Sequence, residues 1–93
     1  LLREVDNVAR YLASSRPTAV NLFWALERMR RAAERNSSKS PAGIKKRLLE
    51  EALKIIVEDK KACRAMARNG ASLIKDGDTI LTHCNAGGLA TAD

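Results

Sequence analysis

Apolar residues recur every three or four positions along the first two-thirds of the chain, which is the spacing of helices with one buried face. The first such segment covers residues 1 to about 14. Its apolar stripe consists of Leu1, Val5, Val8 and Leu12. Proline disfavours helical geometry in the residue before it, so the run Ser14-Ser15-Arg16-Pro17 should interrupt the helix. We therefore predict a first amphipathic helix that ends before Pro17.

A second helix is predicted from about Pro17 to Arg35, since proline suits the first helical position, and Thr18 is a competing candidate for its N-cap. Its apolar residues cover more than one narrow stripe, which is typical of a helix buried on much of its circumference. They are Val20, Leu22, Phe23, Trp24, Leu26 and Met29. The aromatic residues Tyr11, Phe23 and Trp24 are accordingly expected in the core.

A polar loop from Asn36 to Gly43 separates this helix from a third and longer one, which begins between Pro41 and Ile44. The third apolar stripe consists of Ile44, Leu48, Ala52, Ile55, Ile56, Cys63 and Met66. On this stripe Cys63 is interpreted as a packed core thiol. Asn69-Gly70 is one candidate for the helix end, and continuation through residues 71–74 is the alternative. Asp76-Gly77 predicts a turn.

The final stretch, residues 79–93, has a different pattern. The β-branched and apolar run Thr79–Thr82 predicts a strand, the small residues Ala86-Gly87-Gly88 predict a loop, and Leu89–Ala92 could open a helix. A strand, a glycine turn and a helix start form the arrangement that binds phosphate in open α/β sheets. A cysteine at that corner, Cys84, is suited to thiolate chemistry. The alternative is a tight turn that needs glycine and a cysteine that fills a small apolar gap.

Helices followed by one strand predict an α/β protein of which this segment is mostly α-helical. Residues 1–75 are assigned to a helical N-terminal domain, and residues 76–93 to the start of a doubly wound domain. One strand cannot satisfy its own backbone groups, so we expect these residues to be part of a larger chain or to need partner segments.

The charge and the cysteine content of the chain make some classes of protein less favoured than others. The formal net charge is +6, but the basic residues stand beside acids or on helix faces and few aromatic residues accompany them. A solvated helix face is therefore favoured over a nucleic-acid surface. The two cysteines, Cys63 and Cys84, do not form a disulfide framework, which favours a reduced, cytoplasmic protein. One histidine and two separated cysteines make a metal site unexpected, and no apolar run reaches membrane-spanning length.

Arg16 stands at the entrance to the second predicted helix. The sequence pattern alone favours an ordinary exposed charge. A guanidinium at a helix N-terminus is also suited to clamp a phosphate or carboxylate, and this alternative stays open.

Two segments carry a resemblance to a known family. Arg16–Ala25, which reads RPTAVNLFWA, and Asp76–Gly87, which reads DGDTILTHCNAG, closely resemble methylthioribose-1-phosphate isomerases. The resemblance implies a helical N-terminal domain, a Rossmann-like C-terminal domain and a homodimer. The implied reaction converts 5-methylthioribose 1-phosphate to 5-methylthioribulose 1-phosphate in methionine salvage, with no metal, cofactor, nucleic acid or membrane.

The same resemblance implies roles for individual residues. Cys84 would lie in the active site and take part in moving a proton, or alternatively a hydride, between C1 and C2. Arg16 would bind the substrate phosphate, and the backbone of Asn85, Ala86 and Gly87 would line the pocket. Strand alternation would place His83 on the face opposite Cys84, which favours a structural role for the histidine.

The chain also departs from the family pattern. Gly88 stands where alanine is more common. The catalytic aspartate and an Arg-Gly-Ala phosphate loop of the family lie outside these residues, so we expect the segment alone to be inactive. Two related classes remain as alternatives: ribose-1,5-bisphosphate isomerase, and the non-enzymatic regulatory subunits of translation initiation factor 2B.

Overall fold

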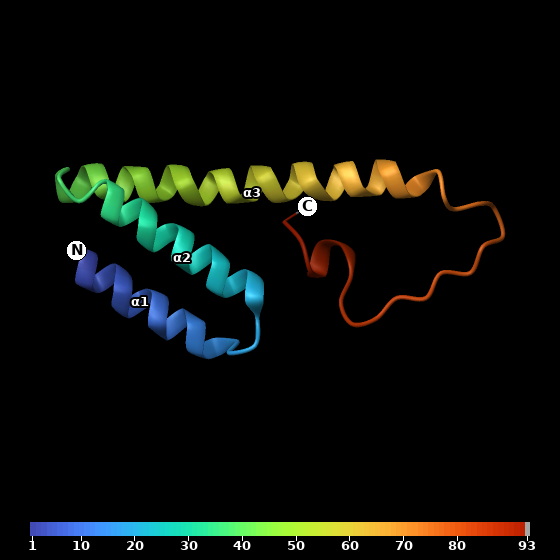
Figure 1. Cartoon of the computed structure of the whole chain (residues 1–93), viewed down its shortest axis with the longest axis horizontal. Coiled ribbons are helices and arrows are strands. Elements are labelled where there is room, and N and C mark those ends of the chain that lie inside the picture. Colours follow the sequence, from blue (N-terminus) through green and yellow to red (C-terminus); the bar gives the residue numbers. More distant parts are fainter. Residues whose placement is uncertain (93) are drawn as a thin grey trace. The chain divides into compact units, whose positions relative to one another are not determined.

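The computed structural model describes residues 1–92 and is mostly helical. Three α-helices, α1 (Leu2–Ser15), α2 (Val20–Arg35) and α3 (Pro41–Ala71), precede a short 3₁₀ turn, η1 (Gly87–Leu89) (Figure 1). The chain separates into two compact units. The first unit is Leu1–Leu53 and the second begins at Lys54, so the long helix α3 contributes residues to both.

The turn between α1 and α2 departs from the predicted helix start. The hydroxyls of Ser14 and Ser15 donate to the carbonyl oxygens of Tyr11 and Leu12 at 2.7 and 2.6 Å, which satisfies carbonyl groups of the last turn of α1. The start of α2 predicted at Pro17 is wrong, because Ala19 is extended and is the N-cap of a helix that begins at Val20. The residues between the helices form a tight turn, in which the Ala19 N–H donates to the Arg16 carbonyl at 3.0 Å.

The start of α3 follows directly from its sequence. The Ser40 hydroxyl accepts the Gly43 N–H at 3.2 Å, so serine caps the helix while Pro41 takes the first helical position. A Cβ on Gly43 would lie 3.2 Å from the Lys39 Cβ, which favours glycine there. The helix ends at Ala71, one residue after the predicted stop at Asn69-Gly70.

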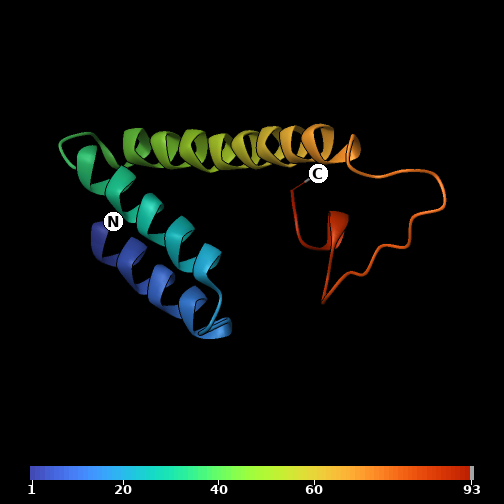
Figure 2. The same cartoon turned by 45° about the vertical axis from the view of Figure 1, so that its right-hand side comes forward.

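The core of the first unit is formed by α1 and α2, which run antiparallel beside each other (Figures 1 and 2), and by the start of α3. Its buried residues are mostly alanines, which let helices approach closely. They are Ala9, Ala32, Ala33 and Ile44. The prediction that the aromatic residues are buried is wrong for the described residues.

The exposed aromatic residues show how little of α2 is covered. Phe23, Trp24 and Tyr11 are 44%, 53% and 78% exposed. Helix α1 packs along α2 and α3 contacts α2 through the Arg28–Glu51 ion pair, but the apolar residues of α2 occupy more than the stripes that these contacts cover. The Arg28 guanidinium covers part of the Trp24 ring at 5.4 Å from its centroid, a cation–π contact. Cys63, expected in the core, is half-buried.

Beyond α3 the chain forms turns without a sheet. The predicted turn at Asp76-Gly77 is confirmed, because the Asp78 N–H donates to the Lys75 carbonyl at 3.1 Å and Gly77 has a φ of +86°. The predicted strand Thr79–Thr82 is not formed, since residues 1–92 contain no second strand with which it could pair. A helix starting at Leu89 is also not formed, and η1 stands in its place.

The Rossmann-like domain and the boundary after residue 75 remain predictions. Across residues 1–92, no helix has the length and apolar character needed to span a membrane.

Candidate functional site

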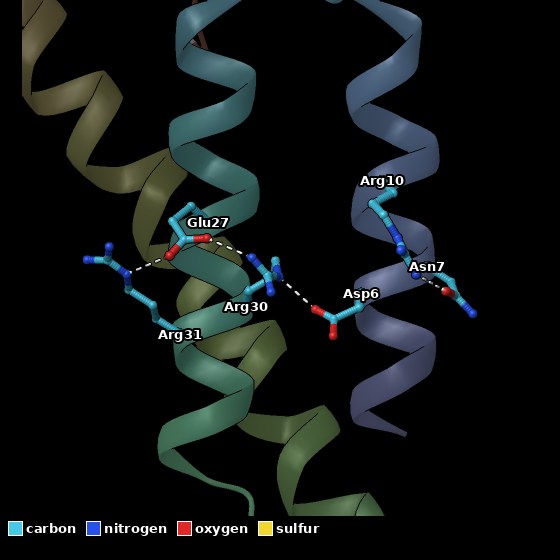
Figure 3. A network of polar contacts seen from close by, with 6 residues as sticks. All are labelled: Asp6, Asn7, Arg10, Glu27, Arg30 and Arg31. Carbon is cyan, nitrogen blue, oxygen red and sulfur yellow. Dashed lines mark hydrogen bonds and ion pairs between the residues drawn. The ribbon is translucent and has the colours of Figure 1, made fainter.

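An ion-pair network joins α1 to α2 (Figure 3). Arg30 Nε lies 2.6 Å from Asp6 Oδ1, and its Nη1 lies 3.1 Å from Glu27 Oε2. The second Glu27 oxygen, Oε1, lies 2.8 Å from Arg31 Nε. The network ties α1 to α2 through Asp6 and Arg30, which are remote in the sequence from the turn that carries Arg16.

The network changes the acidity of its members in the direction expected for opposite charges. Hydrogen bonding and attraction from Arg31, with a further contribution from Arg30, lower the pKa of the Glu27 carboxyl. The Asp6 carboxylate raises the pKa of the Arg30 guanidinium. Both groups are therefore held charged.

The network borders a groove of about 480 Å³ between α1 and α2. Both charged and apolar residues line it. The lining residues are Asp6, Ala9, Arg10, Ala13, Phe23, Leu26, Glu27 and Arg30. Carboxylates and guanidinium groups stand in equal number here, so the groove offers no excess positive charge for a phosphate.

Arg16 lies in the α1–α2 turn and is exposed. Its backbone is non-helical, with φ −143° and ψ 75°, and it ends α1. The helix α2 begins at Val20, so Arg16 precedes a helix N-terminus as the sequence predicts. An exposed guanidinium at this place is accessible to an anion from solvent.

Cys84 lies in the second unit with an unusual backbone conformation. Its φ of +61° is left-handed, which non-glycine residues seldom adopt and which costs about 1–3 kcal/mol. Cys84 is exposed and its thiol is free. Sequence reasoning missed this conformation, because asparagine or glycine is its usual signal and neither occupies position 84. Strained residues of this kind cluster at functional sites.

The backbone after Cys84 changes from extended to left-handed within a few residues. Ala86 is extended, with φ −135° and ψ 165°, and Gly87 is left-handed, with φ +62°. The Gly87 carbonyl accepts the Ala90 N–H at 2.9 Å and the Thr91 hydroxyl at 3.1 Å, which closes η1. A turn of three residues carries little of the dipole of a full helix. The helix N-terminus predicted beside Cys84 is therefore absent from residues 1–92.

The structure groups the predicted site residues into two sets. Cys84, Asn85, Ala86 and Gly87 follow one another in one exposed loop of the second unit. Arg16 belongs to the first unit. His83 is also exposed, and the strand alternation that was to separate it from Cys84 is not formed.

The end of the described chain returns to α3. The Ala92 N–H donates to Asp59 Oδ2 at 2.8 Å, so the loop that follows Cys84 contacts the middle of α3 (Figures 1 and 2). Within residues 1–92, no group of three or more His, Cys, Asp or Glu side chains is placed to hold a metal ion.

Comparison with protein-family models gives a match over nearly the whole chain. The model of the Initiation factor 2 subunit family matches residues 1–92. No solved structure matches the chain significantly.

Curated relatives are enzymes much longer than this chain. A methylthioribose-1-phosphate isomerase of Geotalea uraniireducens is 60% identical over 97% of the chain, and one of Geotalea daltonii is 57% identical over the same share. A 5-deoxyribose 1-phosphate isomerase of Moorella thermoacetica is 54% identical over 96% of the chain. The chain spans about a quarter of the length of these relatives, 25–26%.

Proposed function

The chain belongs to the Initiation factor 2 subunit family, and we propose that the intact protein is an aldose–ketose isomerase acting on 5-methylthioribose 1-phosphate. The observation that carries the proposal is the 60% identity to a methylthioribose-1-phosphate isomerase over 97% of the chain. Both resembling segments, residues 16–25 and 76–87, lie inside the family match. The product would be 5-methylthioribulose 1-phosphate, within methionine salvage.

Cys84 is the residue proposed to serve the reaction at C1 and C2. Isomerisation moves hydrogen between neighbouring carbons, and a proton-transfer group must therefore lie within hydrogen-bond reach of them. An exposed thiol in a strained loop is accessible to such a substrate. The backbone of Asn85, Ala86 and Gly87 would line the same pocket, where the left-handed Gly87 leaves room for close approach.

Arg16 is proposed to bind the substrate phosphate. A guanidinium presents its donors in a fixed fork that matches phosphate oxygens, and the Arg16 side chain is exposed at the α1–α2 turn. The assembled site would require residues 1–75, as a helical domain, and residues 76–93, as the start of a Rossmann-like domain. We further propose a cytoplasmic homodimer.

A second substrate is supported by a specific observation. Relatives from Moorella thermoacetica and Petrotoga mobilis, 54% and 51% identical, are named 5-deoxyribose 1-phosphate isomerase. This sugar phosphate and methylthioribose 1-phosphate differ at C5, whereas C1, C2 and the phosphate are common to both. The same roles of Cys84 and Arg16 would therefore serve either substrate.

The test is an isomerase assay on the intact protein with both 1-phosphates and ribose 1,5-bisphosphate in parallel. We expect the ketose product from methylthioribose 1-phosphate, with the highest kcat/KM of the three. A clear preference for one of the other two sugar phosphates would change the proposed substrate but leave the proposed isomerase reaction unchanged. No turnover of any of them by a folded protein would contradict the proposal and favour a regulatory subunit.

A further inference from the structure

Asp59 places a carboxylate on the apolar stripe of α3. At 100° per residue, the residues before and after it on this stripe fall within about 40° of Asp59. They are Leu48, Ala52, Ile55, Cys63 and Met66. The neighbouring acid Glu58 falls about 100° away and forms an ion pair with Lys54 at 3.9 Å. A carboxylate on an apolar face loses hydration when that face is covered, so Asp59 needs a polar partner there.

The partner of Asp59 is a backbone amide that follows Cys84 in the sequence. The Ala92 N–H donates to Asp59 Oδ2 at 2.8 Å, and the two residues are 33 positions apart. A hydrogen bond to a charged acceptor is about twice as strong as one between neutral groups. Asp59 is half-buried, and so are Ile55 and Cys63, one turn before and after it. The contact lies inside the second unit, which holds both Asp59 and Ala92.

The contact is made where the segment after α3 first becomes partly buried. Residues 71–90 are all exposed, whereas Thr91 is half-buried. The Thr91 hydroxyl donates to the Gly87 carbonyl at 3.1 Å, which helps to close η1 just before the contact. Two residues separate Cys84 from Gly87, the first residue of η1. A restraint directly after η1 therefore limits where Cys84 can lie.

We propose that Asp59 is a positioning residue that holds residues 84–92, the Cys84 loop, for the reaction of the thiol. The inference rests on the proposed function, since it concerns the placement of Cys84 relative to C1 and C2 of the sugar phosphate. Without the contact, the loop has more conformations to lose before the thiol reaches the substrate. A displacement of about 1 Å in a reacting group can lower a rate about 100-fold.

The restraint should act on kcat more than on KM. The phosphate contact is assigned to Arg16, which does not depend on the hydrogen bond between Asp59 and Ala92. Asp59 itself acts through the backbone of the loop, because its Oδ2 accepts the Ala92 N–H. Its contribution is therefore the placement of Cys84 and not a contact with the substrate.

The experiment compares Asp59→Ala and Asp59→Asn with the wild type in the intact protein. The matched control is Glu58→Ala, which removes the adjacent carboxylate from a different face of α3. Alanine favours helices more than aspartate does, so Asp59→Ala should leave α3 folded. Two quantities are measured in each protein: hydrogen–deuterium exchange of peptides that cover residues 85–92, and kcat and KM for methylthioribose 1-phosphate.

We expect Asp59→Ala to accelerate exchange in residues 85–92 about tenfold and to lower kcat about tenfold, with KM changed by less than about twofold. The amide oxygen of asparagine can still accept the Ala92 N–H, so Asp59→Asn should recover part of both losses. Glu58→Ala should match the wild type in both measurements. This combination of results supports positioning by Asp59.

The opposing outcomes are distinct. Unchanged exchange in Asp59→Ala would show that Asp59 does not hold the loop and would overturn the inference. Faster exchange with wild-type kcat, or the same changes in Glu58→Ala, would overturn it as well, and each of these results leaves the isomerase assignment intact. Absence of turnover by the wild-type protein overturns the proposed function and the catalytic role of Asp59, whereas the exchange comparison still shows whether Asp59 holds the Cys84 loop.

Discussion

The first unit and the segment after Ala71 differ in how their backbone groups are satisfied. Helices α1 and α2 form their hydrogen bonds internally and are joined by the Asp6–Arg30–Glu27 network. Residues 72–92 contain turns and one 3₁₀ turn, and Ile80 and Leu81 are 66% and 96% exposed. Helical structure needs only local sequence, whereas a strand needs a neighbour. Most of the candidate site residues, Cys84 to Gly87, lie in residues 72–92, which form no α-helix or sheet of their own.

The largest expected effect concerns packing. Ile44 is 4% exposed and Ile80 is 66% exposed, so the same isoleucine-to-alanine change should have different costs. We expect Ile44→Ala to lower the free energy of unfolding of this chain by about 2–5 kcal/mol. Ile80→Ala should change it by less than about 0.5 kcal/mol. Urea denaturation followed by circular dichroism measures both.

The same pair in the intact protein sharpens the comparison. If residues 79–82 become a strand inside a sheet there, Ile80→Ala should become about as costly as Ile44→Ala. An equal cost of the two variants already in the isolated chain would contradict the difference between the two regions.

The helices were predicted more accurately from the sequence than the segment after Ala71. The periodicity of α1 and α3 is local, so both helices were placed to within about two residues of their observed ends. The start of α2 was missed, because the turn made by Arg16 and Ala19 overrides the preference of Pro17 for a first helical position. The burial of Trp24 was overestimated, since pattern alone does not show how many neighbours cover a helix.

The candidate site was predicted from motifs and not from geometry. The sequence alone predicted that four site residues would lie together in one loop, because they are consecutive. They are Cys84, Asn85, Ala86 and Gly87. The left-handed φ of Cys84 did not follow, because no glycine or asparagine marks it. The roles of Arg16 and Cys84 stay predictions that kinetics must test.

Substitution of Arg16 tests whether the first unit binds substrate or only supports the fold. In the intact protein we expect Arg16→Ala to reduce kcat/KM by about 10- to 100-fold, through the loss of charge-assisted hydrogen bonds to the phosphate. Arg16→Lys keeps the charge but loses the fork, so it should recover part of the loss. Steady-state kinetics give both values.

Arg3→Ala is the matched control for Arg16, because Arg3 is also an exposed arginine of the first unit. It should leave kcat/KM unchanged. Wild-type kinetics in Arg16→Ala would show that this side chain does not bind substrate and that the first unit only supports the fold.

The smallest expected effect is the pH dependence of the Glu27 network. The folded pKa of Glu27 lies below its ordinary value of 4.5, so the carboxylate stabilises the fold above that value. This contribution is lost as pH falls through the lowered folded pKa. Glu27→Gln should therefore be less stable than wild type at pH 7, and the difference should vanish in acid.

Chemical denaturation at a series of pH values measures this difference. The Arg31→Gln background should reduce it, because Arg31 is the largest cause of the lowered pKa of Glu27. A difference between wild type and Glu27→Gln that is constant from pH 7 into acid would show that the ion pairs do not stabilise the helix pair.

The most direct test of the central claim is the turnover of methylthioribose 1-phosphate by the intact protein and its Cys84→Ala variant. Loss of a proton-transfer group should lower kcat by about 10²- to 10⁴-fold. Cys63→Ala is the matched control, since Cys63 is the other free cysteine and lies on α3. The predicted result is loss of turnover in Cys84→Ala with retention in Cys63→Ala. Wild-type turnover by a folded Cys84→Ala variant would contradict the assignment of the chemistry to this loop.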